Sequence, residues 1–488
     1  MEGWNILIII VAYFGLLLLV GWLTGGKSSN NTAFFSGNKR SPWYIISIGM
    51  IGTSLSGVTF VSVPGLVRQV DMTYMQLVFG FLFGYILIAR ILLPLYYRLN
   101  LTSIYSWLDD RIGPRGYRTG ACFFLLSKLV GAAARLYLVV WILQTCVFER
   151  WHVPFEVTAV ASVFLVWLYT FRGGIRTIIW TDTLQAICLL VMLAGILWQV
   201  KQSLSLDMAG MVQTVTASEH FRIFEFKDWG STQHFVKQFL SGVFIPVVMT
   251  GLDQDMMQKN LSCRNLREAQ RNMYSYGFAF IPVNFLFLCL GILLLTLAAQ
   301  QQIALPDIND DILPMFCTSG ILGYSTLIFF TVGIIAAAFS SADSALTALT
   351  TSFCVDILGL EKDRSAQARR TRMRVHLLVA LVFTLIIIIF RLFSSRSLID
   401  AIYMIASFTY GPLLGLFAFG LFTKRKPVNR LVPYVCIAAP LICYALDYCV
   451  FRYAGYRFGY EILLLNGALT FAGLWFRSEK MEAGVMNK

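Results

Sequence analysis

A stripe of oxygen-bearing side chains interrupts one long apolar stretch of this chain. Ser340, Asp343, Ser344 and Thr347 recur at intervals of three and four residues, so a helix places them on one face. Hydroxyl and carboxylate oxygens suit a hard cation, whereas a face in contact with lipid would be apolar. The alternative is tight helix packing, in which hydroxyls bond to the preceding turn. The stripe therefore indicates a cation site and leaves close packing open.

A second acidic residue, Asp182, lies inside another apolar stretch. A charge at membrane depth costs at least about 2.5–3.5 kcal/mol, so we expect Asp182 to be paired or functional. Lys128 and Arg135 are candidate ion-pair partners. The sharper interpretation is that Asp182 faces Asp343 and Ser344 across a cation site. Without a cation, two neighbouring carboxylates would repel, and one would tend to stay protonated.

The composition predicts the elements that must hold these residues. Of 488 residues, 57% are hydrophobic and 13% are charged, against about 45–50% and about 25% in soluble proteins. A soluble fold and a disordered chain are both excluded, and the expected class is an all-α polytopic membrane protein. We expect about thirteen transmembrane helices, near 4–24, 43–67, 74–97, 119–149, 153–171, 177–200, 234–256, 273–300, 323–356, 375–395, 398–422, 431–451 and 459–476.

The net charge of +13 fits loops on one side of a membrane better than it fits nucleic-acid binding. Most of the 39 Lys and Arg fall in alternate loops, Lys259 among them. This alternation predicts a multi-pass protein of the plasma (inner) membrane, with the N-terminus outside and the C-terminus cytoplasmic. Partners are then the lipid bilayer and a small solute, with no nucleic acid.

Two of the predicted helices are interrupted. The second contains glycines and hydroxyls over 51–60, and the seventh contains Ser241, Gly242 and Pro246 near its middle. Proline removes a backbone donor, and broken helices persist in membranes only where protein or a water-filled cavity receives the freed groups. Breaks five segments apart indicate corresponding positions of an inverted repeat and a binding site between them. Two ordinary kinked helices are the alternative.

Other motifs point away from an enzyme. Residues 21–28 match the letters of a P-loop, but a transmembrane helix precedes them where a strand is required, so no nucleotide partner is expected. The ten cysteines lack metal-ligand spacing, and no catalytic set of histidines is visible. We therefore expect no cofactor and no catalytic residues, with sodium as the only metal. An intramembrane enzyme is disfavoured for this reason.

Six motifs in order resemble the sodium:solute symporter family across nearly the whole chain. The resemblance implies a leucine-transporter-like fold: a leading helix and loop over 1–42, five-helix inverted repeats over 43–200 and 234–423, an outer loop over 201–233, and two trailing helices with a cytoplasmic tail over 424–488. The motifs are GTSLSGVTFVSVP at 52–64, LTSIYSWLDDR at 101–111, GGIRTIIWTDTLQ at 173–185, DQDMMQ at 253–258, AxxSS at 337–341 and GPLLGLF at 411–417.

The resemblance also implies two sodium sites. At the main site the ligands would be carbonyl and hydroxyl oxygens on the broken second helix and on the ninth helix, because unwound carbonyls point at the cation: Gly52, Leu55, Ala337, Ser340 and Ser341. A second site, present in the bacterial sialic acid branch, corresponds to Asp182, Ser340, Asp343 and Ser344. That branch has serine where this chain has Asp343, so the stoichiometry or the proton dependence of this chain can differ.

The solute is less constrained. By resemblance to the sialic acid branch, Ser54, Ser56, Thr59 and Tyr74 would line the solute pocket. The arginine that binds the carboxylate in that branch aligns with Gly131, and Arg135 lies one helical turn further on the same face. Arg135 is therefore either a ligand of a substrate carboxylate or a structural partner. Val78 and Pro246 replace polar residues of that branch.

Together these features predict a sodium-coupled secondary active symporter. It would import a small polar organic solute, such as an organic acid, a sugar acid, an amino acid or a sugar, by alternating access. One alternative is a proton-coupled transporter that uses Asp182 and Asp343. Another is a solute sensor that keeps the fold without transporting.

Overall fold

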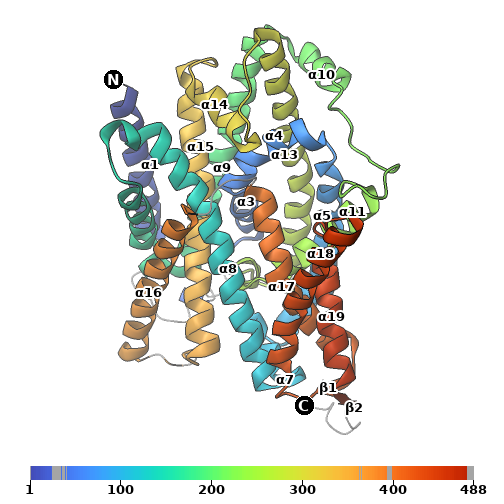
Figure 1. The fold of residues 1–488 in the computed structure, drawn as a ribbon. Coiled ribbons are helices and arrows are strands. Elements are labelled where there is room, and N and C mark those ends of the chain that lie inside the picture. Colours follow the sequence, from blue (N-terminus) through green and yellow to red (C-terminus); the bar gives the residue numbers. More distant parts are fainter. Residues whose placement is uncertain are drawn as a thin grey trace.

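The computed structural model describes residues 2–24, 34–35, 39, 41–361, 363, 365–392 and 398–480 as a bundle of helices (Figure 1). The helices of the first half are α1 (Glu2–Thr24), α3 (Trp43–Ser54), α4 (Gly57–Val70), α5 (Tyr74–Leu87), α6 (Leu93–Arg98), α7 (Trp107–Arg111), α8 (Pro114–Leu143), α9 (Phe155–Ser203) and α10 (Met208–Ala217). Those of the second half are α11 (Phe235–Pro246), α12 (Gln254–Leu261), α13 (Leu266–Gln301), α14 (Ile312–Thr318), α15 (Tyr324–Ser352), α16 (Ala366–Phe390), α17 (Leu398–Phe422), α18 (Val432–Ala454) and α19 (Ile462–Phe476).

Short elements complete the architecture. Four π-helical turns continue longer helices: η2 (Ile88–Leu92), η4 (Gln144–Phe148), η6 (Val247–Gly251) and η8 (Phe353–Ile357). The 3-10 turns whose full extent is described are η3 (Ile104–Ser106), η5 (Glu149–Trp151) and η7 (Asn309–Asp311). The strands β1 (Arg425–Pro427) and β2 (Ser478–Lys480) pair antiparallel, with Arg425 opposite Lys480.

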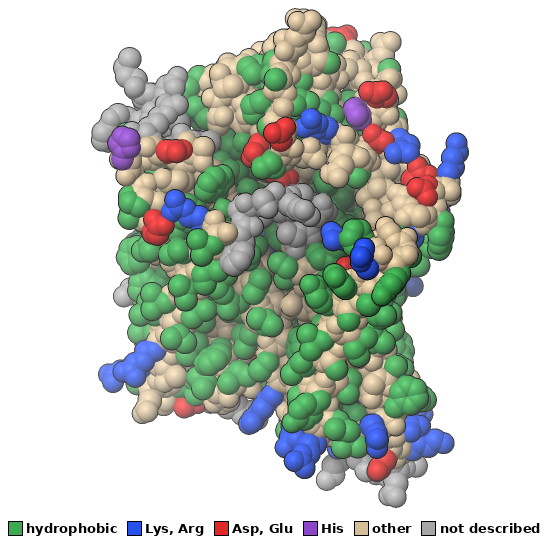
Figure 2. All heavy atoms as spheres, viewed as in Figure 1, with side chains coloured by type: hydrophobic (Ala, Val, Ile, Leu, Met, Phe, Trp, Pro, Cys, Tyr) green, Lys and Arg blue, Asp and Glu red, His purple; other side chains and the backbone are tan. Residues whose placement is uncertain are grey.

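Within the described residues, nine helices are long and apolar enough to cross a membrane, or up to eleven if each of two bent pairs is one span. Two shorter apolar helices, Phe155–Phe171 and Ile462–Phe476, coincide with two further predicted segments. The termini lie at opposite ends of the bundle (Figure 1). Figure 2 shows a broad hydrophobic band over this face, with Lys and Arg gathered at the end where the C-terminus lies. The helical membrane fold is confirmed, and the count of thirteen spans stays a prediction.

The core of the bundle is α15. Every residue from Phe330 to Ser352 is buried, so this stretch of the helix has protein on all sides and no lipid-facing stripe. Its neighbours include α8 and α9. The oxygen-bearing stripe of α15 is therefore surrounded by other helices, which must supply its partners.

The long helix α9 is two helices joined at a kink. Gly174 has φ +57° and ψ −156°, a conformation that only glycine adopts without strain. A Cβ at this position would lie 2.6 Å from the Cα of Phe34. The kink separates two of the predicted segments, and the second half of α9 carries Asp182.

Two helix pairs are bent in the middle of the protein. The axes of α3 and α4 meet at 60° around Leu55 and Ser56, within the predicted break. The α11–η6 helix and α12 meet at 67°. Here the predicted position is wrong, because the chain stays helical through Pro246 and η6 and breaks only at Leu252 and Asp253. The π-helical turn accommodates the proline, and the Asp253 side chain caps the new helix by accepting from the amide of Asp255 at 2.9 Å.

Parts of some predictions fall outside the described residues. Residues 25–28 of the P-loop-like stretch and the tail beyond residue 480 are among them. The predicted outer loop over 201–233 contains the helix α10, which lies at the same end of the molecule as the N-terminus (Figure 1).

Candidate functional site: a cavity and a buried charge cluster

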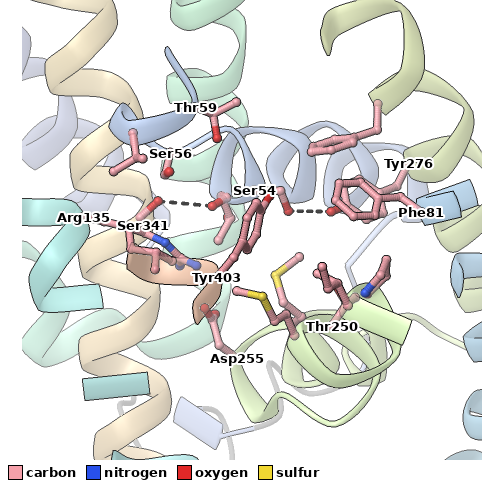
Figure 3. Close-up of a pocket in the computed structure, with 18 of the residues that line it drawn as sticks. Ser54, Ser56, Thr59, Phe81, Arg135, Thr250, Asp255, Tyr276, Ser341 and Tyr403 are labelled. Atoms are coloured by element: carbon pink, nitrogen blue, oxygen red, sulfur yellow. Dashed lines mark hydrogen bonds between the residues drawn. The ribbon is translucent and has the colours of Figure 1, made fainter. Parts of the chain in front are cut away.

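A cavity lies where the bent pair α3 and α4 meets the second bent pair. Its empty volume, including the space that opens to solvent, is about 740 Å³. Helices α8, α13 and α17 close its sides with Arg135, Tyr276 and Tyr403 (Figure 3). The predicted solute residues Ser54, Ser56 and Thr59 all line it. The break between α3 and α4 thus places three hydroxyls on one cavity wall.

Tyrosines extend this hydroxyl wall. Ser54 Oγ lies 2.5 Å from the hydroxyl of Tyr276, which in turn lies 2.8 Å from that of Tyr85. Tyr74, the fourth predicted solute residue, does not line the cavity. Its hydroxyl lies 3.1 Å from that of Tyr403, which does line the cavity. Tyr74 is therefore connected to the cavity through Tyr403.

Arg135 points from α8 into the cavity (Figure 3). Among the described residues, neither a hydrogen bond nor an ion pair is found for its guanidinium. It also borders a second, smaller cavity, together with Gly131, where a Cβ would meet nothing within 4 Å. The half-buried cation thus faces open space on two sides and is available to an anion.

The pairing of Asp182 with Lys128 or Arg135, considered as an alternative, does not occur among the described contacts. Lys128 instead bonds Asp255 at 2.7 Å and both oxygens of Asp253 at 3.2 Å. The hydroxyl of Tyr410 donates to Asp253 at 2.7 Å. The ion pairs of Lys128 therefore fix the start of α12 against α8.

Of the expected main sodium site, the structure shows Ser341 of α15 in contact with the first break. Ser341 Oγ donates to the carbonyl of Thr53 at 3.2 Å and to that of Ala337 at 3.3 Å. Leu55 is fully buried at the break. At Gly52, a Cβ would lie 2.8 Å from the Cβ of Ala186, so only glycine permits this approach of α3 to α9. Ser340 lies on α15 next to Ser341, but its hydroxyl donates to Asp182 at 2.6 Å.

Three hydroxyls surround Asp182 at the expected second site. Besides Ser340, both Thr53 and Ser344 donate to the carboxylate, each at 3.1 Å. Asp343, the other predicted acid, has a different partner, because the hydroxyl of Tyr169 donates to it at 2.9 Å. The structure therefore brings Asp182, Ser340 and Ser344 together and leaves Asp343 beside them on its own contact.

The position of Lys259 corrects a prediction. Counted among the cytoplasmic loop residues, Lys259 is in fact on α12 and is 1% exposed. Its ammonium pairs with Asp182 at 2.8 Å and donates to Thr53 at 2.6 Å and to Ser344 at 2.7 Å. The error follows from the misplaced second break, because a helix that restarts at Gln254 carries Lys259 back into the bundle. The spacing of Asp255 and Lys259, one helical turn apart, was the sequence signal for this buried helix.

The comparison with known proteins decides the family. Residues 34–429 match the sodium:solute symporter family. The chain belongs to this family. A sodium/sialic acid symporter, NanT of Aliivibrio fischeri, is 27% identical over 444 residues, 86% of this chain and 84% of its own length. The sodium/sialic acid symporter SiaT of Proteus mirabilis is 26% identical over 445 residues, 87% of this chain and 86% of its own length.

Solved structures show the fold to which this chain is similar. The chain resembles a substrate-bound, outward-open sodium-coupled sialic acid symporter with a TM-score of 0.82 and 21% identity, over 99% of this chain and 100% of that one. A nucleobase-cation-symport transporter, Mhp1, gives a TM-score of 0.59 at 13% identity, over 92% and 93% of the two chains. The first likeness confirms the expected leucine-transporter-like fold, and the family is one of sodium-coupled symporters.

Proposed function

We propose that this protein imports a small organic anion together with sodium. The observation that carries the proposal is Arg135, a half-buried cation that lines the same cavity as the hydroxyls of Ser54, Ser56 and Thr59 (Figure 3). A guanidinium binds a carboxylate through two parallel hydrogen bonds, and hydroxyls bind the polar remainder of the solute. The relatives NanT and SiaT are symporters of sialic acid, which is itself a carboxylate.

Sodium is proposed to bind between the first break and α15. Carbonyls of Gly52, Leu55 and Ala337, with the hydroxyls of Ser340 and Ser341, supply the oxygens. Ser341 contacts both the solute cavity and the proposed sodium site, because it lines the cavity and donates a hydrogen bond to Thr53 at the break. A sodium ion held there would keep the break against α15 and support the adjacent solute wall, so sodium and solute should tighten each other reciprocally.

The remaining expectations belong to the same proposal. The protein would lie in the plasma (inner) membrane with its N-terminus outside and its C-terminus cytoplasmic, the end where Lys and Arg gather in Figure 2. The two bent pairs would belong to inverted repeats over 43–200 and 234–423, whose rocking exposes the cavity to each side in turn.

Uptake by proteoliposomes tests this function. The solution inside the vesicles is the same in every assay. The outside solution is chosen to give an inward sodium gradient, an inward proton gradient or no gradient. The labelled probes are sialic acid, lactate, proline and glucose. We expect sodium-driven accumulation of sialic acid, of lactate or of both, and no accumulation of glucose. Accumulation of glucose alone would refute the proposal that the solute is an organic anion. If no probe accumulates under any gradient, the result would favour a solute sensor over a transporter.

Proton coupling is kept as the second candidate because of one observation. Asp343 is fully buried, and its Oδ1 has no hydrogen-bond partner among the described residues. A buried carboxylate without a cation is favoured in its neutral form. Accumulation driven by the proton gradient in sodium-free solution would establish this candidate in place of sodium coupling.

A further inference from the structure

The ammonium of Lys259 occupies a position built from oxygens of three helices. Thr53 belongs to α3, Asp182 to α9 and Ser344 to α15, and all three lie within 2.8 Å of the lysine nitrogen. All three side chains are at most 6% exposed. The lysine itself enters from a fourth helix, α12. A single positive charge therefore joins four helices at the centre of the protein.

The chemistry of this position is that of a monovalent cation site. A carboxylate and two hydroxyls present lone pairs to one point, which an ammonium satisfies through its three donors. Sodium carries the same charge and would take the same oxygens, so the two cations exclude each other. The lysine is covalently attached beside the site and does not have to be drawn from solution, which gives it a high effective concentration.

The surroundings hold the lysine in place. Asp255, one helical turn before it, lies 3.5 Å from its nitrogen. Asp255 is in turn bonded to Lys128 at 2.7 Å, so α12 is tied to α8 as well as to the site. Withdrawing Lys259 to admit a sodium ion would require α12 to move or a buried ammonium to lose its partners, which is expensive in a medium of low dielectric constant.

We propose that Lys259 is a built-in cation that fills the second cation position, so that one sodium ion is bound per solute. The inference rests on the proposed sodium coupling and deepens it, because it assigns the stoichiometry and the residue that sets it. Removal of the lysine side chain opens the position, and Asp182 with Ser344 then binds a second sodium ion.

Binding of radioactive sodium to the purified protein in detergent, without any solute, tests the stoichiometry. The wild type is expected to bind one sodium per chain with a Hill coefficient near 1. Lys259→Met, which keeps the length of the side chain without its charge, is expected to bind two. In the double variant Asp182→Asn/Lys259→Met the count should return to one. The matched control is Lys201→Met at the far end of α9, which should bind one.

The outcomes separate the inference from the function beneath it. Binding of two sodium ions by the wild type would overturn the inference that Lys259 fills the second cation position. Binding of one ion by a folded Lys259→Met variant would overturn it as well. If Lys259→Met does not fold, the wild-type count alone decides, with one ion in support and two against. No sodium binding by any variant would instead overturn the proposed sodium coupling.

Discussion

Lys259 and Asp182 make unequal contributions to stability, and their difference can be measured. At an effective dielectric constant of about 20, their attraction over 2.8 Å amounts to about 6 kcal/mol before desolvation. Lys259 has a second acid, Asp255, at 3.5 Å, where the same relation gives about 5 kcal/mol. Among the described residues, the other partners of Asp182 are the hydroxyl donors of Thr53, Ser340 and Ser344.

The two single substitutions should therefore differ in their effects. Lys259→Met leaves Asp182 as an uncompensated buried charge, so we expect the free energy of unfolding to fall by about 3–5 kcal/mol. Asp182→Asn leaves Lys259 beside Asp255, and the expected loss is about 1.5–3 kcal/mol, that of a hydrogen bond to a charged group. The double variant should lose less than the sum, with a coupling of about 2 kcal/mol or more.

Equilibrium unfolding by sodium-free denaturing detergent, followed by circular dichroism, measures the three losses. Sodium at about a hundredfold above its dissociation constant should then raise the free energy of unfolding of Lys259→Met by about 2.7 kcal/mol more than that of the wild type, because the emptied position binds an ion. A larger loss for Asp182→Asn than for Lys259→Met, or strictly additive losses, would refute this account of the buried charges.

Three further outcomes follow from the cavity and the packing. Ser341→Ala should raise the sodium concentration needed for half-maximal uptake at least about tenfold, because about 1.4 kcal/mol of binding is lost; an unchanged sodium dependence would remove Ser341 from the ligands. Arg135→Ala should abolish uptake of the organic anion while one sodium still binds, and equal uptake by the variant would exclude a carboxylate contact. Gly242→Ala would place a Cβ 2.2 Å from the carbonyl oxygen of Leu77 and should destabilise the α5–α11 contact by about 1–3 kcal/mol. The matched control is Gly15→Ala on α1, where a Cβ meets nothing within 4 Å. This control should have the same melting temperature as the wild type.

The sequence was sufficient for the features that depend on local composition. Apolar runs mark the membrane helices because a bilayer selects for length and hydropathy. The first break was predictable because Gly52, Gly57 and the hydroxyls between them disfavour a continuous helix, and the cavity wall of Ser54 and Ser56 follows from that break.

The features that depend on contacts between distant segments were not predictable in this way. Pro246 looked like a break, yet a π-helical turn absorbs it, and the real break is set by Asp253, which caps α12 and pairs with Lys128. The polar run that starts there lowers the local hydropathy as a loop does. Whether Lys259 faces the cytoplasm or a carboxylate depends on where the helix restarts, and this is decided by tertiary partners.

The lysine at the second cation position also bears on how the membrane potential acts on transport. A fixed ammonium stays with the protein, so a single sodium ion carried with a monoanion moves no net charge across the bilayer. Each elementary charge that crosses 100 mV is worth about 2.3 kcal/mol, or about a fiftyfold difference in accumulation. With the proposed stoichiometry, the chain would forgo that contribution and use the sodium concentration gradient alone, so uptake would continue in a cell that has lost its membrane potential.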